Sequence, residues 1–423
     1  MQGQKGGLQV TGEEQFLRGH FQRFYQGREI EGPPDLASRE FGFGVFGRKI
    51  ANRNLSFQDR KAFNRFLRSS VPFFVSYSNA LYKFPERRPM QAKEFLGGDL
   101  VYEFDADDLP TDCKQSHDSW LCPSCGKAGK GRQLKCDECG SPTKLEEWFC
   151  PDCLDAAKHR VFALLSFLED DFGFTEGIAI NFSGRAGYHV HVRNEMVRQL
   201  SSEARVELID YLTANGLNIF SHFQKEATFF KCGSAAFGGW PQRILEKLGG
   251  VLEEGNVEKI AVMGNTTVAM AKRLLKEKQL ILTSIKERKV IPSIFGRVNT
   301  KSESKSDRFW QHFLNSIVAG ISPIDRQTSV DLNKIVRVPE TLHGQTGFVS
   351  ASLGKDSLAK FNPFDDALAF SNQGTVKVFI NKSPRIYLSG ERFGPFEKQE
   401  AELPLNVAIF LLGRQSAELA EKV

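Results

Sequence analysis

The chain has 423 residues, more than the usual size of one compact domain, and a hydrophobic fraction of 41% allows a substantial core. It contains no run of about eighteen apolar residues, which argues against a membrane-spanning helix, and its first residues lack the apolar segment of a signal peptide. A net charge of +5 permits nucleic-acid binding without arguing strongly for it. We therefore expect a cytoplasmic protein.

Helical and strand-like segments alternate along the chain. The spacing of apolar residues predicts helices over residues 13–25, 58–69, 154–171, 202–214, 258–279, 308–318 and 405–420. Strands are expected over 39–49 (a Gly-rich pair), 71–82, 99–110, 177–193, 376–380 and 386–388. Residues 226–250 match neither pattern, and residues 286–308, which are basic and Ser-rich, predict an exposed loop.

Three acidic residues at every second position end one of these strands. The segment DLVYEFDADDLP, residues 99–110, contains Glu103, Asp105 and Asp107, and Pro110 follows them. Side chains alternate along a strand with a period of two, so these carboxylates are expected on one face. Mg²⁺ or Mn²⁺, which prefer oxygen ligands, would explain why the fold keeps them together. The alternative is an acidic strand end that is only exposed to solvent.

Seven of the eight cysteines lie between Cys113 and Cys153, a clustering that favours metal binding over disulfides in a cytoplasmic protein. Two Cys-x-x-Cys pairs, separated by ten residues, predict one tetrahedral zinc site. Its ligands would be Cys122, Cys125, Cys136 and Cys139.

A third Cys-x-x-Cys pair, Cys150 and Cys153, begins a predicted helix and needs two further ligands. Cys113 and His117 are the available candidates, and together the eight side chains would close two structural zinc sites. The alternative is a free thiol and a surface histidine at these two positions. The pattern does not settle the role of Cys232.

Two Gly-containing turns carry cations and histidines typical of phosphate binding. The first, SGRAGYHVHV, offers Ser183, Arg185 and His189, with backbone amides that can approach a phosphate closely. The second, IVRVPETLHGQTG, offers Arg337 and His343. Asp325 lies upstream in a polar loop, where Asp331 is as well suited to a local cap as to a ligand. Carboxylates together with two such turns fit two-metal nucleotidyl transfer.

These segments resemble, in this order, the catalytic small subunit of archaeal and eukaryotic DNA primases in its archaeal form. The resemblance is carried by REFGF at residues 39–43, GGDLVYEFDADD, CPDCLDAAK at 150–158, SGRAGYHVHV and the stretch from Arg337 to Gly347. The tail, from FNPFDDALAF to VAIFLLGR, also matches, so the resemblance covers nearly the whole chain.

The resemblance implies a mixed α/β primase core, formed by residues 1–110 and 154–423, with a zinc-binding insert at 111–153. It implies two catalytic Mg²⁺ or Mn²⁺ ions held by Glu103, Asp105 and Asp325. It also implies triphosphate binding by the Ser183, Arg185, His189, Arg337 and His343 side chains. The expected partners are nucleoside triphosphates, a single-stranded DNA template and an iron–sulfur-containing large subunit in a heterodimer.

The chain departs from the family pattern at two positions. Glu103 stands where the family usually carries Asp, and Ala186 stands where many relatives carry a second Arg. The Cys122–Cys139 ribbon is an elaboration that many relatives lack. Because Glu103 with Asp105 and Asp105 with Asp107 share the same spacing, periodicity alone does not choose the metal-binding pair.

Three functions are therefore compared. The first is a primase that makes primers de novo, and the second is a primase-like polymerase that extends ends in DNA repair. The third is a zinc-ribbon nucleic-acid-binding protein without catalysis. The nearly full-length archaeal pattern favours the first.

Overall fold

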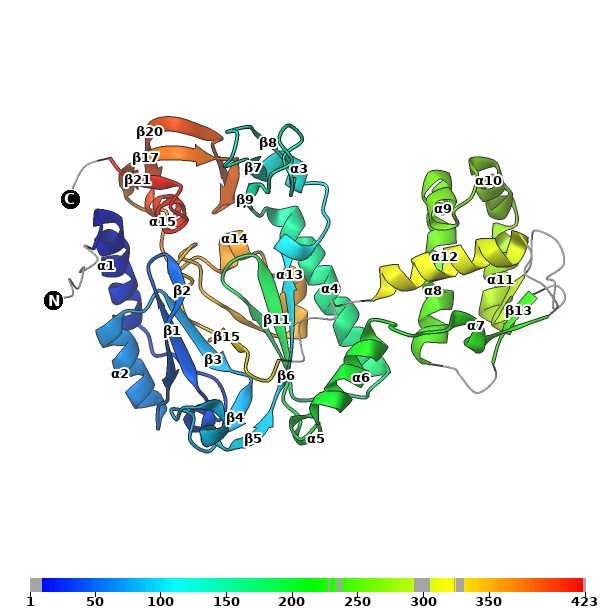
Figure 1. The fold of residues 1–423 in the computed structure, drawn as a ribbon, viewed down its shortest axis with the longest axis horizontal. Coiled ribbons are helices and arrows are strands. Elements are labelled where there is room, and N and C mark those ends of the chain that lie inside the picture. Colours follow the sequence, from blue (N-terminus) through cyan, green and yellow to red (C-terminus); the bar gives the residue numbers. More distant parts are fainter. Residues whose placement is uncertain are drawn as a thin grey trace. The chain divides into compact units, whose positions relative to one another are not determined.

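The computed structural model describes residues 10–226, 229–233, 238–292, 305–322, 324 and 331–420, and its fold is mixed α/β, as predicted (Figure 1). The chain forms two compact units. Unit 1 comprises Met1–Val161, Gly177–Leu200 and Thr328–Val423, and unit 2 comprises Phe162–Glu176 and Ser201–Gln327. The cysteine-rich residues 111–153 fall within unit 1. Among the described residues, no helix is both long and apolar enough to cross a membrane.

Two antiparallel four-stranded sheets form the centre of unit 1. The first has the order β15-β3-β1-β2 and consists of Ile335–Arg337, Phe74–Ser78, Phe41–Val45 and Arg48–Leu55. The second has the order β16-β10-β11-β6 and consists of Ser352–Leu353, Ile178–Phe182, Gly187–Val192 and Leu100–Asp105. The sheets meet where the Tyr77 ring of β3 stacks on the His191 ring of β11, with ring centroids 6.0 Å apart.

Aromatic residues fill the outer side of the first sheet. Phe41 and Phe43 of β1 pack against Phe63 and Phe66 of helix α2, with ring centroids 4.4–5.2 Å apart in the closest pairs. Helices α1 (Gly12–Gln26) and α2 (Arg60–Ser70) contact one another. Many of the 36 phenylalanines in the sequence are used in this way, which explains their abundance.

Smaller elements complete unit 1. Around the two central sheets lie η1 (Leu36–Ser38), β4 (Ala80–Tyr82), η2 (Met90–Lys93), β5 (Phe95–Gly98), α5 (Glu195–Arg198), α13 (Lys355–Lys360) and α14 (Pro363–Asp366). The cysteine-rich module holds α3 (Lys114–His117), β7 (Ser119–Leu121), β8 (Ala128–Lys130) and β9 (Lys144–Glu146). The C-terminal part holds β17 (Thr375–Ser383), β18 (Ile386–Leu388), β19 (Glu391–Phe393), β20 (Phe396–Pro404), α15 (Leu405–Gly413) and β21 (Ala417–Leu419).

Unit 2 is mainly helical. Its core gathers apolar residues from α8, α11 and α12, among them the fully buried Trp310. The elements are α6 (Ser202–Leu212), α7 (Ile219–His222), β12 (Phe223–Lys225), β13 (Phe229–Cys232), α8 (Gly239–Glu254), α9 (Val257–Met263), α10 (Val268–Lys276), α11 (Lys278–Arg288), β14 (Val290–Pro292) and α12 (Lys305–Ile321). Helix α4 (Pro151–Asp170) begins in unit 1 and ends in unit 2.

The expected exposed loop at 286–308 is partly wrong, because β14 (Val290–Pro292) pairs with β13 and Ile291 is buried. Other expected elements have different bounds. The acidic strand does not reach Pro110: β6 ends at Asp105, because residues 106–108 form a 3₁₀ turn, η3, closed by the bond from the Leu109 amide to the Ala106 carbonyl. The helix expected over 405–420 ends at Gly413, and Gln415 has a φ of 60°. The helical stretch 258–279 breaks after Met263, where Asn265 has a φ of 44°.

A buried ion pair joins the two central sheets. Nη2 of Arg39 lies 2.6 Å from Oδ2 of Asp99, and both side chains are completely buried. Arg39 precedes β1, whereas Asp99 precedes β6. The guanidinium also donates to the carbonyls of Ser78 and Asn79, and Asp99 accepts from Arg198 at 3.0 Å. The start of the acidic strand is therefore anchored by charge.

We predict that Asp99→Asn lowers the free energy of unfolding by about 3–5 kcal/mol, because the buried Arg39 loses its counter-charge. Urea denaturation measures the change. The matched control is Glu31→Gln, which removes the partner of Arg60 in an exposed ion pair and is expected to cost less than about 1 kcal/mol. Equal, small effects of both substitutions would contradict the assigned role of Asp99.

Candidate active site and metal clusters

The structure brings the eight predicted zinc ligands into two groups. In the first, the Cys122 cluster, the ligand atoms of Cys122, Cys125, Cys136 and Cys139 all lie within 4.8 Å of one another. The Sγ atoms of Cys122 and Cys139 are 3.5 Å apart, and those of Cys125 and Cys136 are 3.6 Å apart. A tetrahedral ion with Zn–S bonds of about 2.3 Å separates its sulfur ligands by about 3.8 Å, so this donor set fits zinc.

The second group, the Cys113 cluster, consists of Cys113, His117, Cys150 and Cys153. His117 is buried, which excludes the alternative of a surface histidine, and its Nε2 lies 3.2 Å from Sγ of Cys153. Its Nδ1 faces Asp118 at 2.8 Å, the arrangement that orients a metal-binding imidazole. The two clusters have closed donor sets, which suits a structural role.

The acidic end of β6 lies beside β11, and each of its carboxylates faces basic or imidazole groups. Glu103 is paired with His189 in the antiparallel register, and their side chains approach to 3.7 Å between Oε1 and Nε2. Glu103 also forms an ion pair with Lys334. In the η3 turn, Oδ2 of Asp107 lies 2.5 Å from Nη1 of Arg185, whereas its buried Oδ1 has no hydrogen-bond partner among the residues that the structure describes.

Asp105 is the acidic residue whose ionisation the site changes most clearly. Water reaches the residue, yet protein surrounds much of its carboxylate. This desolvation, followed by the charges of Asp107 and Glu103, raises the pKa of Asp105 from 3.8 to about 6, although Arg185 opposes the change. Placing a cation beside these carboxylates would relieve their repulsion, so the donor chemistry fits a hard divalent ion.

The two Gly-containing turns pack against each other. Gly184 has a φ of 84°, and a Cβ added there would lie 2.8 Å from Cβ of His343. The Thr346 hydroxyl donates to the Gly184 carbonyl at 2.6 Å. Gly187 sits opposite Asp105, where a Cβ would approach the Phe104 carbonyl to 2.4 Å. Glycine is therefore required by close approach at both positions, and the predicted phosphate-binding turns form one surface.

Arg337 and His343 are buried beside this surface. Nη1 of Arg337 donates to the Val75 carbonyl at 3.3 Å, and its Nε has no hydrogen-bond partner within the described part of the chain. Burial lowers the pKa of Arg337 to about 10, which shows that its charge is incompletely compensated. Burial, and then the charge of Arg337, hold the pKa of His343 well below its usual range, so this imidazole is neutral. Burial also lowers the pKa of His189.

Two further lysines contribute to the electrostatics of the site and were not among the predicted residues. Lys334 is the ion-pair partner of Glu103. Lys49, on β2, has its pKa lowered by desolvation and by Arg185, whereas Asp105 raises it. Lys334 precedes Arg337 by three residues in a basic stretch, which is a weak signal. Nothing in the spacing around Lys49 distinguishes it from a solvated surface lysine.

Not every predicted ligand is brought together. Asp325 lies outside the described residues. Within the part of the chain that the structure describes, groups of three or more potential ligand side chains occur within 4.8 Å only at the two cysteine clusters. Glu103, Asp105 and Asp107 therefore lie near one another without forming so tight a group. Ser183 is held by the hairpin, in which its amide bonds to the Gly187 carbonyl at 2.8 Å.

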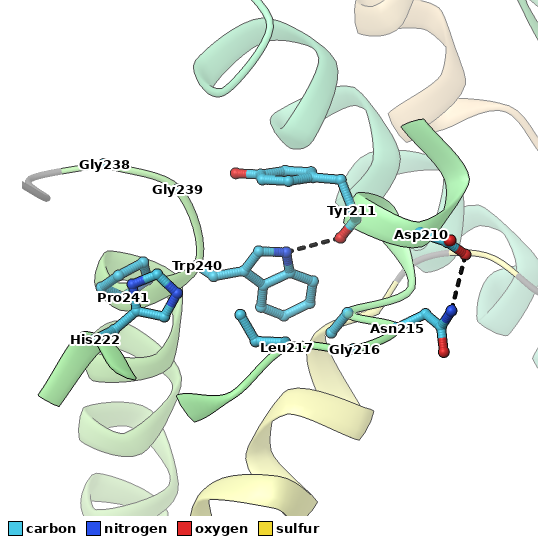
Figure 2. A pocket seen from close by; sticks show the side chains of 11 residues that line it. Asp210, Tyr211, Asn215, Gly216, Leu217, His222, Gly238, Gly239, Trp240 and Pro241 are labelled. Carbon is cyan, nitrogen blue, oxygen red and sulfur yellow. Dashed lines mark hydrogen bonds between the residues drawn. The ribbon is translucent and has the colours of Figure 1, made fainter. Parts of the chain in front are cut away.

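A separate cavity of about 660 Å³ lies in unit 2 (Figure 2). It is mainly apolar, and the indole N–H of Trp240 points at the Tyr211 carbonyl, to which it donates at 2.8 Å. Asn215 donates to Asp210 at 3.0 Å at another side of the cavity. None of the predicted catalytic or metal-binding residues lines it, so the cavity is not the candidate active site.

Comparison with known proteins gives consistent matches. A family model described as the DNA primase small subunit matches residues 141–354. The DNA primase small subunit PriS of Methanothrix thermoacetophila is 30% identical, over 96% of this chain and 98% of its own length. PriS proteins of Methanocella arvoryzae and Nitrosopumilus maritimus are 28% and 27% identical, over 95% and 96% of this chain and 98% of their own lengths.

We predict two zinc ions per chain in the purified protein, because two separate closed donor sets are present. Elemental analysis should return two equivalents for the wild type and for Cys232→Ala, which changes the cysteine outside the module. Cys125→Ser should return one. A single zinc in the wild type would exclude the Cys113 cluster as a zinc site.

We predict that Asp105→Asn stabilises the fold above pH 6 and not below pH 4. The folded-state pKa of Asp105, about 6, exceeds its ordinary value of 3.8. The folded state therefore favours the protonated carboxyl group of Asp105. The stability that this protonation contributes is complete below about pH 4 and is lost as the pH rises through about 6. Thermal unfolding from pH 3.5 to 8, without added divalent cations, measures the difference. Asp108→Asn is the neighbouring control, and parallel curves for wild type and Asp105→Asn would contradict the prediction.

Proposed function

Because this chain belongs to the DNA primase small-subunit family, we propose that it is the catalytic subunit of a primase. In this proposal it synthesises short primers de novo on single-stranded DNA by two-metal nucleotidyl transfer. The observation that carries the proposal is the convergence of the acidic end of β6 with two Arg- and His-bearing turns on one surface of unit 1.

The carboxylates of Glu103 and Asp105, together with Asp325, would hold Mg²⁺ or Mn²⁺. When bound, two such ions would activate the attacking 3′-hydroxyl and neutralise the leaving pyrophosphate. Glu103 is one methylene longer than the usual Asp, and its ion pair with Lys334 keeps its carboxylate compensated within the site. Oδ1 of Asp107, which has no partner among the described residues, would be available to accept a hydrogen bond from a water molecule.

The two turns would bind the triphosphate. Arg185 and Arg337 are cations whose Nε atoms are buried without a partner among the described residues, so each guanidinium keeps an unused donor for a phosphate oxygen. Their charges also keep His343 neutral, and a neutral imidazole donates one hydrogen bond without adding charge. The Ser183 hydroxyl and His189 lie on the same hairpin as Arg185. Ala186 stands where many relatives carry a second Arg, and Lys49 would supply that positive charge instead.

The name of the family implies a large subunit, and we propose that this partner carries an iron–sulfur cluster and forms a heterodimer with the chain. Nucleoside triphosphates would be the substrates. The two zinc clusters would stabilise the module at residues 111–153, which we propose is an insert in a primase core built from the flanking segments.

We predict that Asp105→Asn and Glu103→Gln each reduce nucleotide incorporation by at least about a hundredfold, because each removes charge that stabilises the transition state. Glu103→Asp should keep activity, and Asp107→Asn should be milder than either. Primer synthesis on single-stranded DNA in the presence of Mn²⁺ measures all four. Asp108→Asn serves as the neighbouring acidic control.

The same series tests the register of the acidic strand. If Asp107→Asn is inactive while Glu103→Gln works normally, the metal-binding pair is Asp105 with Asp107. If Asp105→Asn retains more than about a tenth of wild-type turnover, the two-metal assignment itself fails.

A further inference from the structure

Two cations of the cysteine-rich module meet at one backbone carbonyl beside the acidic strand. Nζ of Lys114 donates to the Asp107 carbonyl at 2.6 Å, and Nη1 of Arg132 donates to the same oxygen at 2.8 Å. A carbonyl oxygen has two lone pairs, and here both accept a charge-assisted hydrogen bond. Such bonds are about twice as strong as bonds between neutral groups, so the position of this peptide is firmly fixed.

The two donors come from different parts of the module, and each lies next to one metal cluster. Lys114 stands between Cys113 and His117 in the chain and is 5% exposed. Arg132 lies between β8 and the second half of the Cys122 cluster, and its Nη2 is 3.3 Å from Oε1 of Glu147. Metal binding at each cluster would thus order the backbone that holds one of the two donors.

The opposite side of the same turn is held by the β10–β11 hairpin. The Ala106 amide donates to the Ala186 carbonyl at 2.8 Å, and Arg185 binds the Asp107 carboxylate. The segment directly after Asp105 is therefore clamped between the module and the hairpin. A shift of this segment would move the carboxylates that end β6, because they share a continuous backbone with it.

From these contacts we propose that Lys114 and Arg132 are positioning residues that couple the two zinc sites to cation binding at Glu103 and Asp105. The inference rests on the proposed function only in taking these carboxylates as the cation ligands. Neither donor touches the ion or the substrate. Their loss acts through the Asp107 peptide, and changes to groups that orient metal ligands typically cost 10- to 100-fold in metal affinity.

Equilibrium binding of Mn²⁺ to the zinc-loaded, full-length protein, followed by the electron paramagnetic resonance signal of free Mn²⁺, tests the proposal without catalysis. Arg132→Met should weaken binding about tenfold. Arg132→Lys, which keeps a charged donor, should bind within about twofold of the wild type. Lys130→Met, an exposed position two residues earlier at the end of β8, is the matched control and should bind like the wild type.

A second measurement separates positioning from general loss of stability. Hydrogen exchange of the peptide that contains residues 105–109 should accelerate in Arg132→Met, while zinc content stays at two equivalents. Lys114→Met should also accelerate this exchange. Because Lys114 is buried, its substitution should lower the stability of the fold more than Arg132→Met does.

The proposal is overturned if Arg132→Met holds two zinc ions and binds Mn²⁺ like the wild type, if Lys130→Met weakens binding equally, or if the wild type binds no Mn²⁺. Failure of the proposed function gives a different result: the wild type binds Mn²⁺, the Arg132 variants differ as expected, and no nucleotide is incorporated. The positioning role of Lys114 and Arg132 and the proposed function can therefore be contradicted independently of each other.

Discussion

Repulsion between carboxylates at the end of one strand is the constraint around which unit 1 is organised. Glu103, Asp105 and Asp107 follow one another at alternate positions, and burial, followed by the charges of Asp107 and Glu103, raises the pKa of Asp105. Cations from separate segments compensate two of these carboxylates: Lys334 pairs with Glu103, and Arg185 pairs with Asp107. The acidic strand end therefore exists only because distant parts of the chain meet there.

The convergence of these segments depends on positions where the chain has little conformational freedom. The hairpin between β10 and β11 must pass very close to Asp105 at Gly187, and its turn must pack against His343 at Gly184. The beginning of β6 is fixed by the fully buried Arg39–Asp99 pair. Both ends of a six-residue strand are thus held by charged contacts from other elements, which gives the site a preorganised geometry.

Local chemistry made part of this structure predictable. The Cys-x-x-Cys pairs specified the Cys122 cluster and half of the Cys113 cluster, because thiolate spacing follows from the geometry of one ion. The β10–β11 hairpin and helix α2 followed from periodicity and glycine placement. The pairing of Glu103 with Lys334, the approach of Lys49, and the bonds from Lys114 and Arg132 to Asp107 were not predictable in this way. Most of them join segments far apart in the sequence, and even the bond from Lys114 to Asp107, seven residues away, follows no helix or strand periodicity.

The bounds of β6 show a second reason why part of the structure could not be predicted from the sequence. A period of two continues through Asp107 in the sequence, yet the strand stops at Asp105, since residues 106–108 form the η3 turn. The hydrogen bonds of this turn, and those from Lys114 and Arg132 to the Asp107 carbonyl, thus override the alternating pattern. The division into two units was hidden for a similar reason, because unit 2 is assembled from separated stretches whose helices carry no signal of the boundary.

The central claim is that this surface starts new strands instead of extending existing ones. Incorporation of labelled nucleotides on circular, unprimed single-stranded DNA, by the chain together with the proposed large subunit, tests it most directly. The account predicts short products that carry a 5′-triphosphate and that disappear with Asp105→Asn. Synthesis that occurs only when a 3′ end is supplied would contradict it and would favour an end-extending polymerase.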